Sequence, residues 1–483
     1  MTIEVNLGEK NGQVSENIYG QFVEHALDCI EGGIYDPQSV FADSSGIRQD
    51  TVEMIRKLAP SVIRFPGGTI ICQYHWEDAV GSKASRIWRK NLIWGGELNP
   101  EFGTAEFVAL CRRVGAEPMI CVNMVSGTAE EAGNWVEYCN GTGNSYYAQL
   151  RKKHGYEEPF GVKYWCIGNE SYSEPDMGIH HNVDDYIRDA MEFIKRMKLT
   201  DDSIMTVVVG SDNKQWNDAV LKALHPVTDY FSLHYYASTK NGRLYEPFEG
   251  EKRLRETLQE ITEVINGYSD TVHGFNPWYR FSPRKDIVKI AVDEWNIWNF
   301  ENNGTYGLKT TYCWRDALWS ASMLNLFIET PSIGMANMAQ MVNVLAPIMV
   351  DEKGTWMQTT AYPFIYYRKL MTGSRVLVNF CSPVIEDAGG INALSIAAVC
   401  KDDKICVAVV NRDFGQFYFV RLSDRDEEIR ESVNITILTG SAPDAVCSRE
   451  VSCIRETRIQ TTGQDIKIPA GSICLIMVEK ERQ

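Results

Sequence analysis

Long hydrophobic runs are missing from this sequence, and none approaches the roughly 18 apolar residues that a membrane helix needs. The first ten residues, MTIEVNLGEK, lack the basic and apolar stretches of a secretory signal. The 13 cysteines form no CxxC pair, and several lie inside apolar runs, where a free thiol packs as a small hydrophobe. We therefore expect reduced cysteines, a cytoplasmic location and no membrane partner.

Positive charge is scarce as well. The chain has 48 lysines and arginines against 64 aspartates and glutamates, which gives a formal net charge of −16. Nucleic acids and anionic membranes reward basic patches. The charge balance therefore argues against nucleic acid as a partner, and it is compatible with a neutral ligand such as a sugar.

Short apolar runs alternate with helix-like segments from residue 18 to about residue 340. Eight of these runs are predicted strands: Ile18–Phe22, Val62–Phe65, Met119–Asn123, Lys163–Ile167, Thr206–Val209, Tyr230–His234, Val288–Val292 and Gly334–Gln340. Eight β-then-α units predict a parallel sheet that closes into a (β/α)₈ TIM barrel. A doubly wound open sheet is the alternative, but its GxGxxG or GxxxxGK[ST] phosphate-binding turn is absent.

Helix signals support this alternation. Thr128 and Glu131 are spaced as a capping box at the start of a helix. Thr104 is the predicted N-cap of a second helix that stops at Gly115. Ile187, Ala190, Met191 and Ile194 form one apolar helix face.

The pattern changes after about residue 376. Five β-rich runs follow: Ile391–Val399, Ile405–Asn411, Gln416–Leu422, Val433–Leu438 and Ile473–Val478. They predict an antiparallel β-sandwich domain. The alternating N-terminal strand Thr2–Leu7 is expected to pair into it. The predicted division is residues 1–15 for this strand, 16–372 for the catalytic barrel and 373–483 for the β-sandwich.

Polar residues collect just after the predicted strands, where a barrel forms its active-site cup. They include Glu24, Arg64, Asn169-Glu170, His234 with Tyr236, and Asp293-Glu294. Glu170 follows the fourth strand and Glu294 the seventh. Such a pair, about 5–5.5 Å apart, is what a retaining glycosidase uses, one carboxylate as nucleophile and one as acid/base. The acid needs a raised pKa while the nucleophile stays ionised, so we expect different surroundings for the two.

Several spaced motifs resemble those of the α-L-arabinofuranosidases of glycoside hydrolase family 51, nearly from end to end. They are Phe22-Val23-Glu24-His25, Gly32-Gly33-Ile34-Tyr35-Asp36-Pro37, Arg64-Phe65-Pro66-Gly67-Gly68, Tyr74-His75-Trp76-Glu77-Asp78, Phe102-Gly103-Thr104, Gly115-Ala116-Glu117-Pro118, Asn134-Trp135-Val136-Glu137-Tyr138, Tyr164-Trp165-Cys166-Ile167-Gly168-Asn169-Glu170, Asp293-Glu294-Trp295-Asn296 and Gln340-Met341-Val342-Asn343.

The resemblance implies Glu170 as acid/base and Glu294 as nucleophile. It implies further that the substrate-binding residues are Glu24, Asn169, Tyr236 and Gln358, with Trp94 and Trp298 as aromatic walls; we add Thr69 and His234. Relatives are commonly intracellular hexamers with a C-terminal β-sandwich and no metal in catalysis. The resemblance therefore implies a homo-oligomer, and we expect no cofactor and no metal.

Three stretches depart from the family pattern. Thr69 stands where the family usually has a sugar-binding asparagine, and it offers one hydroxyl instead of an amide. Met124-Val125-Ser126-Gly127-Thr128 replaces a Gly-Thr-Gly-Thr turn, and Ser171 to Asp176 replace Met-Asp-Gly-Pro-Trp. The motifs therefore predict the type of reaction more firmly than the identity of the sugar.

Plainer interpretations exist for each residue. Glutamates are most often solvated surface residues, and tryptophans are often in the core. Glu24 could form a structural ion pair with Arg64. His25, His75 and His234, with Glu24, Glu77 and Asp78, suggest a metal site, but no HExxH or comparable spacing is present.

We expect a retaining, exo-acting α-L-arabinofuranosidase that removes terminal arabinofuranosyl residues from arabino-oligosaccharides by double displacement. One alternative is a glycosidase of the same mechanism that acts on another furanoside, a β-xyloside or a β-glucan. The other is a sugar-binding relative without catalysis.

Overall fold

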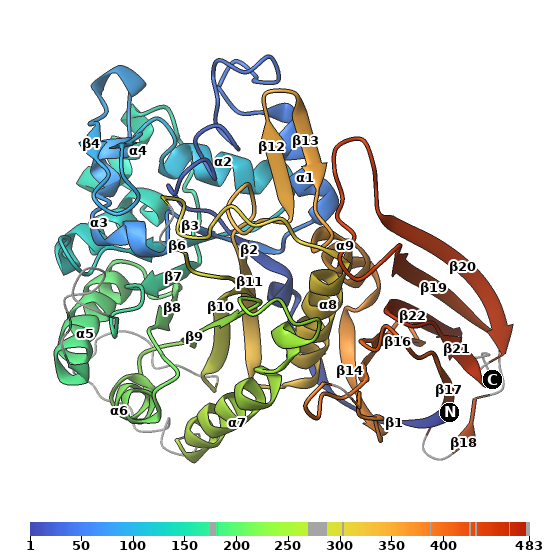
Figure 1. Ribbon diagram of the computed structural model, residues 1–483. Helices are drawn as coiled ribbons and strands as arrows, with labels where there is room; N and C mark the ends of the chain where they lie inside the picture. Colours follow the sequence, from blue (N-terminus) through green and yellow to red (C-terminus); the bar gives the residue numbers. More distant parts are fainter. Residues whose placement is uncertain are drawn as a thin grey trace.

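Eight parallel strands close into a barrel, and a second sheet stands beside it (Figure 1). The computed structural model describes residues 1–173, 180, 182–268, 287–301, 304–386, 388–424, 427–429, 432–462 and 464–479. The barrel strands are β2 (Gly20–Phe22), β3 (Val62–Phe65), β6 (Glu117–Val122), β7 (Tyr164–Ile167), β8 (Met205–Val208), β9 (Tyr230–Ala237), β10 (Lys289–Ile297) and β11 (Ile333–Ala339). The predicted TIM barrel is therefore confirmed.

Several of the predicted strand boundaries were wrong. The first strand starts at Gly20, because Glu16–Tyr19 forms a 3₁₀ turn, η1, that the Ser15 hydroxyl caps by accepting from the N–H of Asn17. Strand β10 runs to Ile297, five residues beyond the predicted end. Glu294 therefore lies within the last part of a strand and not after it.

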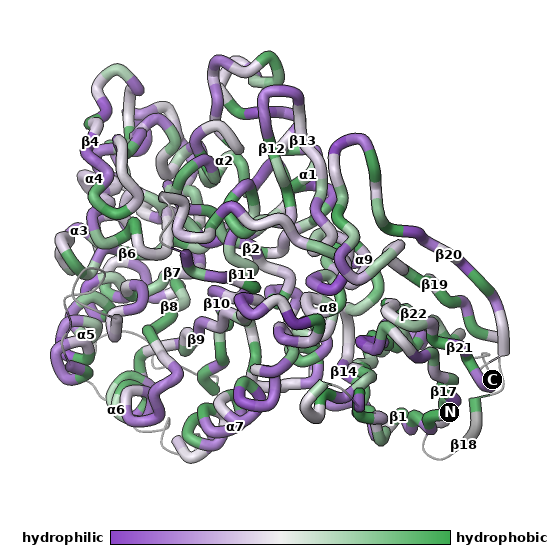
Figure 2. The backbone as a smooth tube through the Cα atoms, viewed as in Figure 1, coloured by the Kyte–Doolittle hydropathy of each residue, from purple (hydrophilic) through white to green (hydrophobic). Residues whose placement is uncertain are grey.

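Helices surround the barrel. They are α1 (Gln49–Leu58), α2 (Thr104–Val114), α3 (Ala129–Asn140), α4 (Tyr146–Lys153), α5 (Val183–Thr200), α6 (Lys214–Leu224), α7 (Glu251–Gly267), α8 (Trp314–Glu329) and α9 (Ala361–Leu370). Figure 2 shows hydrophobic residues along the barrel strands and hydrophilic ones on the outer turns of these helices. Among the described residues, none of the helices has the length and apolar character needed to cross a membrane.

The predicted helix starts are nearly right. Thr128 caps α3 by accepting from the N–H of Glu131 at 3.1 Å. The Glu131 carboxylate does not complete the box, since it binds His75 at 3.0 Å. The N-cap of α2 is Gly103, one residue before the predicted Thr104, whose hydroxyl accepts from the indole of Trp135.

Short elements decorate the barrel. Two hairpins, β4 (Arg89–Lys90) with β5 (Glu97–Leu98) and β12 (Ile348–Asp351) with β13 (Gly354–Met357), project from loops. The remaining 3₁₀ turns are η2 (Thr69–Cys72), η3 (Trp76–Ala79), η4 (Lys83–Ser85) and η5 (Glu246–Phe248).

The C-terminal strands and the N-terminal strand form one sheet of ten strands. The strands are β1 (Thr2–Val14), β14 (Gly373–Phe380), β15 (Leu394–Lys401), β16 (Lys404–Asn411), β17 (Tyr418–Asp424), β18 (Glu427–Glu428), β19 (Ser432–Gly440), β20 (Ile454–Thr462), β21 (Ile466–Ile468) and β22 (Ser472–Glu479). The predicted N-terminal strand is confirmed in this sheet: β1 pairs antiparallel with β14 and parallel with β17. Figure 1 shows the sheet curled on itself. The domain boundary at residue 373 stays a prediction.

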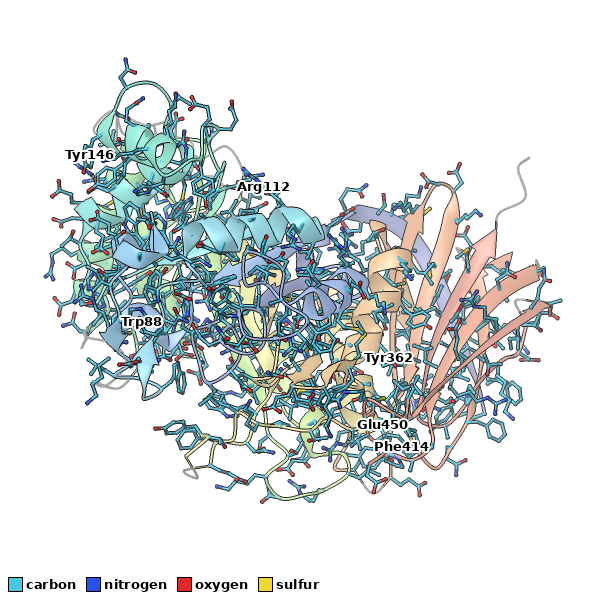
Figure 3. All side chains as sticks on the ribbon, turned by 90° about the horizontal axis from the view of Figure 1, so that it is seen from above. Trp88, Arg112, Tyr146, Tyr362, Phe414 and Glu450 are labelled. Atoms are coloured by element: carbon cyan, nitrogen blue, oxygen red, sulfur yellow. The ribbon has the colours of Figure 1, made fainter. Side chains whose placement is uncertain are left out.

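Helix α8 joins the two parts. It is buried on almost all sides, which a helix tolerates only between two packed bodies. Asn325 donates to the carbonyl of Ser395 in the sheet, and Trp314 donates to the carbonyl of Gly471. Seen from above, Tyr362, Phe414 and Glu450 lie along this boundary, and Trp88 and Tyr146 lie on the far side of the barrel (Figure 3).

Candidate active site

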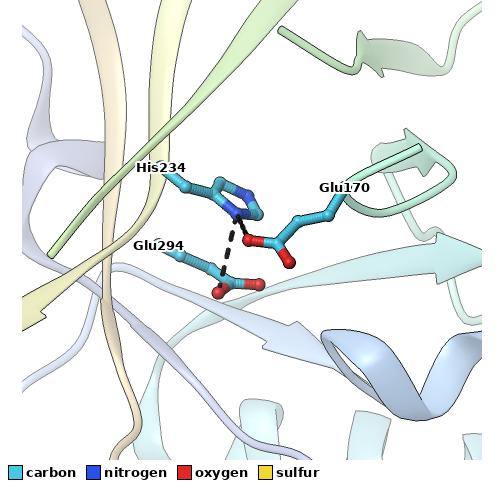
Figure 4. A group of neighbouring side chains, drawn as sticks. All are labelled: Glu170, His234 and Glu294. Atoms are coloured by element: carbon cyan, nitrogen blue, oxygen red, sulfur yellow. Dashed lines mark hydrogen bonds and ion pairs between the residues drawn. The ribbon is translucent and has the colours of Figure 1, made fainter. Parts of the chain in front are cut away.

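The carboxyl ends of β7 and β10 bring Glu170 and Glu294 together (Figure 4). Gly168 leaves β7 at φ 84°, and Glu170 itself adopts φ 42°, in the left-handed region that non-glycine residues rarely occupy. This turn aims Glu170 back over the barrel. One carboxylate oxygen of Glu170 and one of Glu294 lie within 4.8 Å of each other. The side chain of Glu170 is 23% exposed and that of Glu294 is 8% exposed.

His234, within β9, lies between the two glutamates (Figure 4). Its Nδ1 is 2.8 Å from Glu170 and 3.6 Å from Glu294, and its Nε2 is 3.5 Å from Asp293. Burial alone would lower the pKa of His234, but the carboxylates of Glu294, Asp293 and Glu170 raise it well above its usual range. The three carboxylates therefore favour the protonated form of the imidazole.

The predicted raised pKa of the acid is not what the structure gives. Burial would raise the pKa of Glu170, but the hydrogen bond and charge of His234, with a smaller effect of Arg64, lower it below its usual value. These contacts favour a proton on His234 and an ionised carboxylate on Glu170. The sequence does not show this lowered pKa, because it depends on the contact that the fold makes between His234 and Glu170.

Arg64 is the buried cation of the site. It donates from Nη1 to Glu294 and from Nη2 to Asn169, both at 2.7 Å, and its Nε is 3.5 Å from Asp293. Its guanidinium also lies 4.9 Å from the ring of Phe22. Arg64 therefore orients the carboxylate of Glu294 and the side-chain carbonyl of Asn169.

A bulge in β10 explains how Asp293 and Glu294 act in one site. Consecutive side chains of a regular strand point to opposite faces. The pairing of β10 with β9 shifts register between Ala291 and Glu294, and such a bulge re-aims side chains. Both carboxylates therefore approach Arg64 and His234, while Asp293 also accepts from Ser232 at 2.5 Å. Asp293 and Arg64 are the positioning residues that our site prediction missed, although both stood in its motifs.

Glu24 is a third glutamate of the site, and it is buried at 2% exposure. Its carboxylate accepts from the N–H of Ile70 at 2.9 Å, from the indole of Trp94 at 3.1 Å and from the amide of Gln340 at 2.7 Å. These bonds, and not an ion pair with Arg64, hold it. Burial raises the pKa of Glu24 to about 7.

Of the two glutamines near the site, Gln358 was the predicted sugar contact, but Gln340 is the one that contacts Glu24. The amide of Gln358 donates to the carbonyls of Thr310 and Ala346, and its oxygen accepts from the N–H of Tyr312. These bonds to the backbone give Gln358 a structural role. Gln340 instead binds Glu24 in the pocket, and its buried oxygen has no hydrogen-bond partner among the described residues.

Trp94 and Trp298, the predicted aromatic walls, are both partly buried beside the site glutamates, and their role toward a sugar stays a prediction. Tyr236 donates to Glu294 at 2.7 Å, and the ring of Trp298 lies edge-on to it at 5.3 Å. The ring of Trp94 lies edge-on to that of Tyr306 at 5.8 Å. The indole N–H of Trp298 donates to the carbonyl of Tyr306, which connects the two walls.

The altered stretches border this pocket. Thr69 is 8% exposed and starts η2, directly before Ile70, which binds Glu24. In the loop after β6, Asn123 donates to the hydroxyl of Ser126 at 2.8 Å, so this asparagine supports the loop. Residues 174–176 of the stretch after Glu170 lie outside the described residues.

The histidines have separate partners. His25 contacts Glu31 at 2.7 Å and His75 contacts Glu131 at 3.0 Å. Within the described residues, only Glu170, His234 and Glu294 bring three possible metal ligands within 4.8 Å. Glu170 is bonded to His234, and Glu294 to Arg64 and Tyr236, so the three side chains form a hydrogen-bonded cluster.

A closed (β/α)₈ barrel with two facing carboxylates at its strand ends, a buried arginine and aromatic walls is the arrangement of a glycoside hydrolase. Comparison with known proteins agrees. Residues 54–253 match the family profile described as "Alpha-L-arabinofuranosidase 1 domain", and residues 293–470 match "Alpha-L-arabinofuranosidase C-terminal domain".

Similar proteins cover nearly the whole chain. A probable α-L-arabinofuranosidase C of Aspergillus flavus is 35% identical over 85% of this chain and 84% of its own length. An intracellular exo-α-(1→5)-L-arabinofuranosidase of Acetivibrio thermocellus is 30% identical over 88% and 91%. The arabinose complex of a Thermotoga maritima α-L-arabinofuranosidase superposes with a TM-score of 0.88 at 32% identity, over 99% of this chain and 100% of that one. The family 51 enzyme of Thermotoga petrophila gives 0.88 at 31% over the same shares.

The chain belongs to glycoside hydrolase family 51, the α-L-arabinofuranosidases.

Proposed function

We propose that the chain is a retaining, exo-acting α-L-arabinofuranosidase with Glu294 as nucleophile and Glu170 as acid/base. One observation carries the proposal: carboxylate oxygens of the two residues lie within 4.8 Å of each other. Retaining enzymes hold their carboxyl groups about 5–5.5 Å apart, whereas inverting enzymes need about 6.5–9.5 Å for a water molecule. The short separation therefore supports double displacement.

In the first step, Glu294 attacks the anomeric carbon and the glycosidic C–O bond breaks. The leaving oxygen takes a proton from Glu170, which becomes a carboxylate. In the second step, water attacks the anomeric carbon and gives its proton to Glu170, and the ester bond to Glu294 breaks. Arg64 and Tyr236 each donate to Glu294 at 2.7 Å and so orient its carboxylate for the attack.

His234 supplies the proton that Glu170 needs. The two groups share one hydrogen bond of 2.8 Å, so they titrate as a pair and not as independent residues. A sugar that covers Glu170 removes water from it, which raises its pKa and draws the proton across this bond. The attacking water returns a proton to Glu170 in the second step, and transfer of that proton back across the same bond restores the imidazolium and the Glu170 carboxylate.

The sugar bound at the nucleophile contacts the groups around Glu24. We assign Glu24, Asn169, Tyr236 and Gln340 to its hydroxyls, Trp94 and Trp298 to its walls, and Thr69 to the edge. Gln340 takes the role first given to Gln358, because its oxygen is free while Gln358 is committed to backbone groups.

The biological setting of the reaction is part of the proposal. The chain trims terminal arabinofuranosyl units from arabino-oligosaccharides in the cytoplasm, as a homo-oligomer of six subunits without a cofactor. The intracellular exo-α-(1→5)-L-arabinofuranosidase relative supports the substrate and the compartment. Light scattering of the purified protein tests the subunit number.

The deciding experiment uses a panel of aryl glycosides with the wild type and the Glu294→Ala variant. We expect kcat/KM to be highest for the α-L-arabinofuranoside and turnover to vanish in the variant, while Glu260→Ala, on the exposed face of α7, serves as the control. Proton NMR should detect the α anomer as the first product. A preference for a xyloside, glucoside or other furanoside would favour the alternative substrates, and tight sugar binding without product would favour a silent binding protein.

A further inference from the structure

A cavity of about 390 Å³ opens beside Glu170, and residues of β9 and of the first turns of α7 line it (both elements are labelled in Figure 1). Glu170, His234 and Tyr236 form its inner wall, and Tyr172, Asp212 and Arg253 line it further out. Its size is at the lower end of the range of small-ligand sites, about 300–1,000 Å³. Glu170 and His234 therefore line this cavity as well as the proposed catalytic site.

The three outer residues come from consecutive loops of the barrel. Tyr172 follows β7, Asp212 follows β8, and Arg253 lies in the first turn of α7, after β9. Loops at this face of a barrel carry substrate specificity. No hydrogen bond or ion pair within the described part of the chain engages Asp212 or Arg253, and both side chains are exposed. Their polar groups are thus available to a ligand.

We propose that this cavity binds the sugar unit on the leaving-group side of the cleaved bond, and that Tyr172, Asp212 and Arg253 select it. The inference rests on the proposed role of Glu170. Glu24, Asn169, Trp94 and Trp298 border the sugar on the nucleophile side, as described above. The leaving oxygen must lie within hydrogen-bond reach of Glu170. The leaving sugar therefore enters the remaining space that Glu170 borders, which is this cavity.

The chemistry of the lining indicates a neutral sugar. The ring of Tyr172, set edge-on to Trp216 at 6.0 Å, offers a flat apolar surface for the C–H face of a sugar. Asp212 accepts from hydroxyl donors, and Arg253 donates from a planar fork to neighbouring hydroxyl oxygens. Because the two charges have opposite signs, a uronic acid would meet Asp212 as well as Arg253, whereas a neutral diol satisfies both.

The test compares two substrates with the same arabinofuranosyl group. One is α-1,5-linked arabinobiose, which places a sugar in the cavity, and the other is α-L-arabinofuranosyl fluoride, which does not. We expect Arg253→Ala and Asp212→Ala each to lower the ratio of kcat/KM for arabinobiose to kcat/KM for the fluoride about tenfold, the loss expected for a hydrogen bond to a charged group. Arg253→Lys should recover part of the ratio.

Lys252→Ala is the matched control, because Lys252 precedes Arg253 on the same helix and its side chain is 88% exposed. Its ratio should equal that of the wild type. An unchanged ratio in both Arg253→Ala and Asp212→Ala overturns the proposal. A general loss of folding would lower both rates and leave the ratio unchanged. If the wild type hydrolyses neither substrate, the proposed function fails instead, so the two failures are distinguishable.

Discussion

His234 binds Glu170 and lowers the pKa of its carboxyl group. The proposed role of Glu170 as the acid predicts how its removal affects different leaving groups. Glu170→Ala should lower kcat for arabino-oligosaccharides about 10²–10⁴-fold, the usual contribution of a general acid. Substrates with activated aryl leaving groups need little protonation, so their first step should be nearly unaffected. Steady-state kinetics with a series of aryl leaving groups of graded pKa measures this. An equal loss for all leaving groups would contradict the assignment.

The same contact predicts a related effect of His234. His234→Asn removes the imidazole that holds the proton, and we expect kcat for poor leaving groups to fall about 10²-fold. The alkaline limb of the pH profile should move to lower pH, because the imidazolium no longer supplies a proton to Glu170. A variant with reduced kcat but an unshifted pH profile would leave His234 a purely structural residue.

Glu24 couples substrate binding to stability. Its pKa of about 7 in the folded protein exceeds the ordinary value of 4.5, so the folded state binds the extra proton. Its stability contribution is therefore fully present below pH 4.5, is lost as the pH rises to 7, and stays lost above it, for a total of about 3 kcal/mol. Glu24→Gln should raise the melting temperature at pH 8 but not at pH 4.5, and it should reduce kcat/KM.

Single residues also show which parts of the site could be predicted from the sequence and which could not. Glu170 and Glu294 were predictable because each follows an apolar β-run in a motif. The bulge that turns Asp293 and Glu294 toward the same arginine was not, since it depends on register with β9. Gln358 and Gln340 both stand in recognisable motifs, and only the fold decides which of them contacts Glu24.

At the scale of elements, the backbone of β2 lies close to its neighbours β3 and β11 at Gly20. A Cβ added to Gly20 would lie 2.6 Å from the carbonyl of Ala336 and 2.7 Å from Val62. Gly20→Ala should therefore destabilise the protein by about 1–3 kcal/mol, the cost of overpacking. Gly267→Ala is the control, because its added Cβ meets nothing within 4 Å and should be neutral or slightly stabilising. Urea unfolding of both variants checks the difference, and equal stabilities would contradict it.

The elements that the sequence revealed are those with strong patterns. All eight barrel strands were found because buried parallel strands are continuous apolar runs. Strand β20 was missed, since its residues are mostly exposed and show no alternation. Strands β18 and β21 were missed because they have only two and three residues. These strands depend on their neighbours for pairing and carry little signal of their own.

At the scale of the whole molecule, the N-terminal strand β1 pairs with strands of the C-terminal part of the chain. The alternating burial of Ile3, Val5 and Leu7 was visible in the sequence, and it predicted a partner sheet. The parallel pairing with β17 was not visible, because parallel and antiparallel neighbours bury the same side chains. The contact of this sheet with the barrel could not be predicted either, since it depends on polar residues that lie far apart in the chain.

One such contact is a buried ion pair. Arg412, in the loop after β16, contacts Glu251 of α7 at 2.7 Å and donates to Ser322 of α8 at 2.9 Å, and its side chain is 3% exposed. Removing one partner of a buried pair leaves an unpaired charge. Arg412→Met should therefore cost about 3–5 kcal/mol of unfolding free energy, measured by urea denaturation at pH 7.

The double variant Arg412→Met with Glu251→Leu separates the value of the pair from the cost of breaking it. Well-packed apolar residues often replace a buried ion pair without loss, so most of the stability should return. Acid sensitivity should change as well. Burial would raise the pKa of Glu251, but Arg412 and Arg255 lower it below its usual value. Its contribution is therefore present above its unfolded pKa and is lost as the pH falls through the lower folded value. The wild type should lose more stability than the double variant in this acid range. If the double variant is as unstable as Arg412→Met, the ion pair itself stabilises the contact between the barrel and the sheet, and apolar packing cannot replace it.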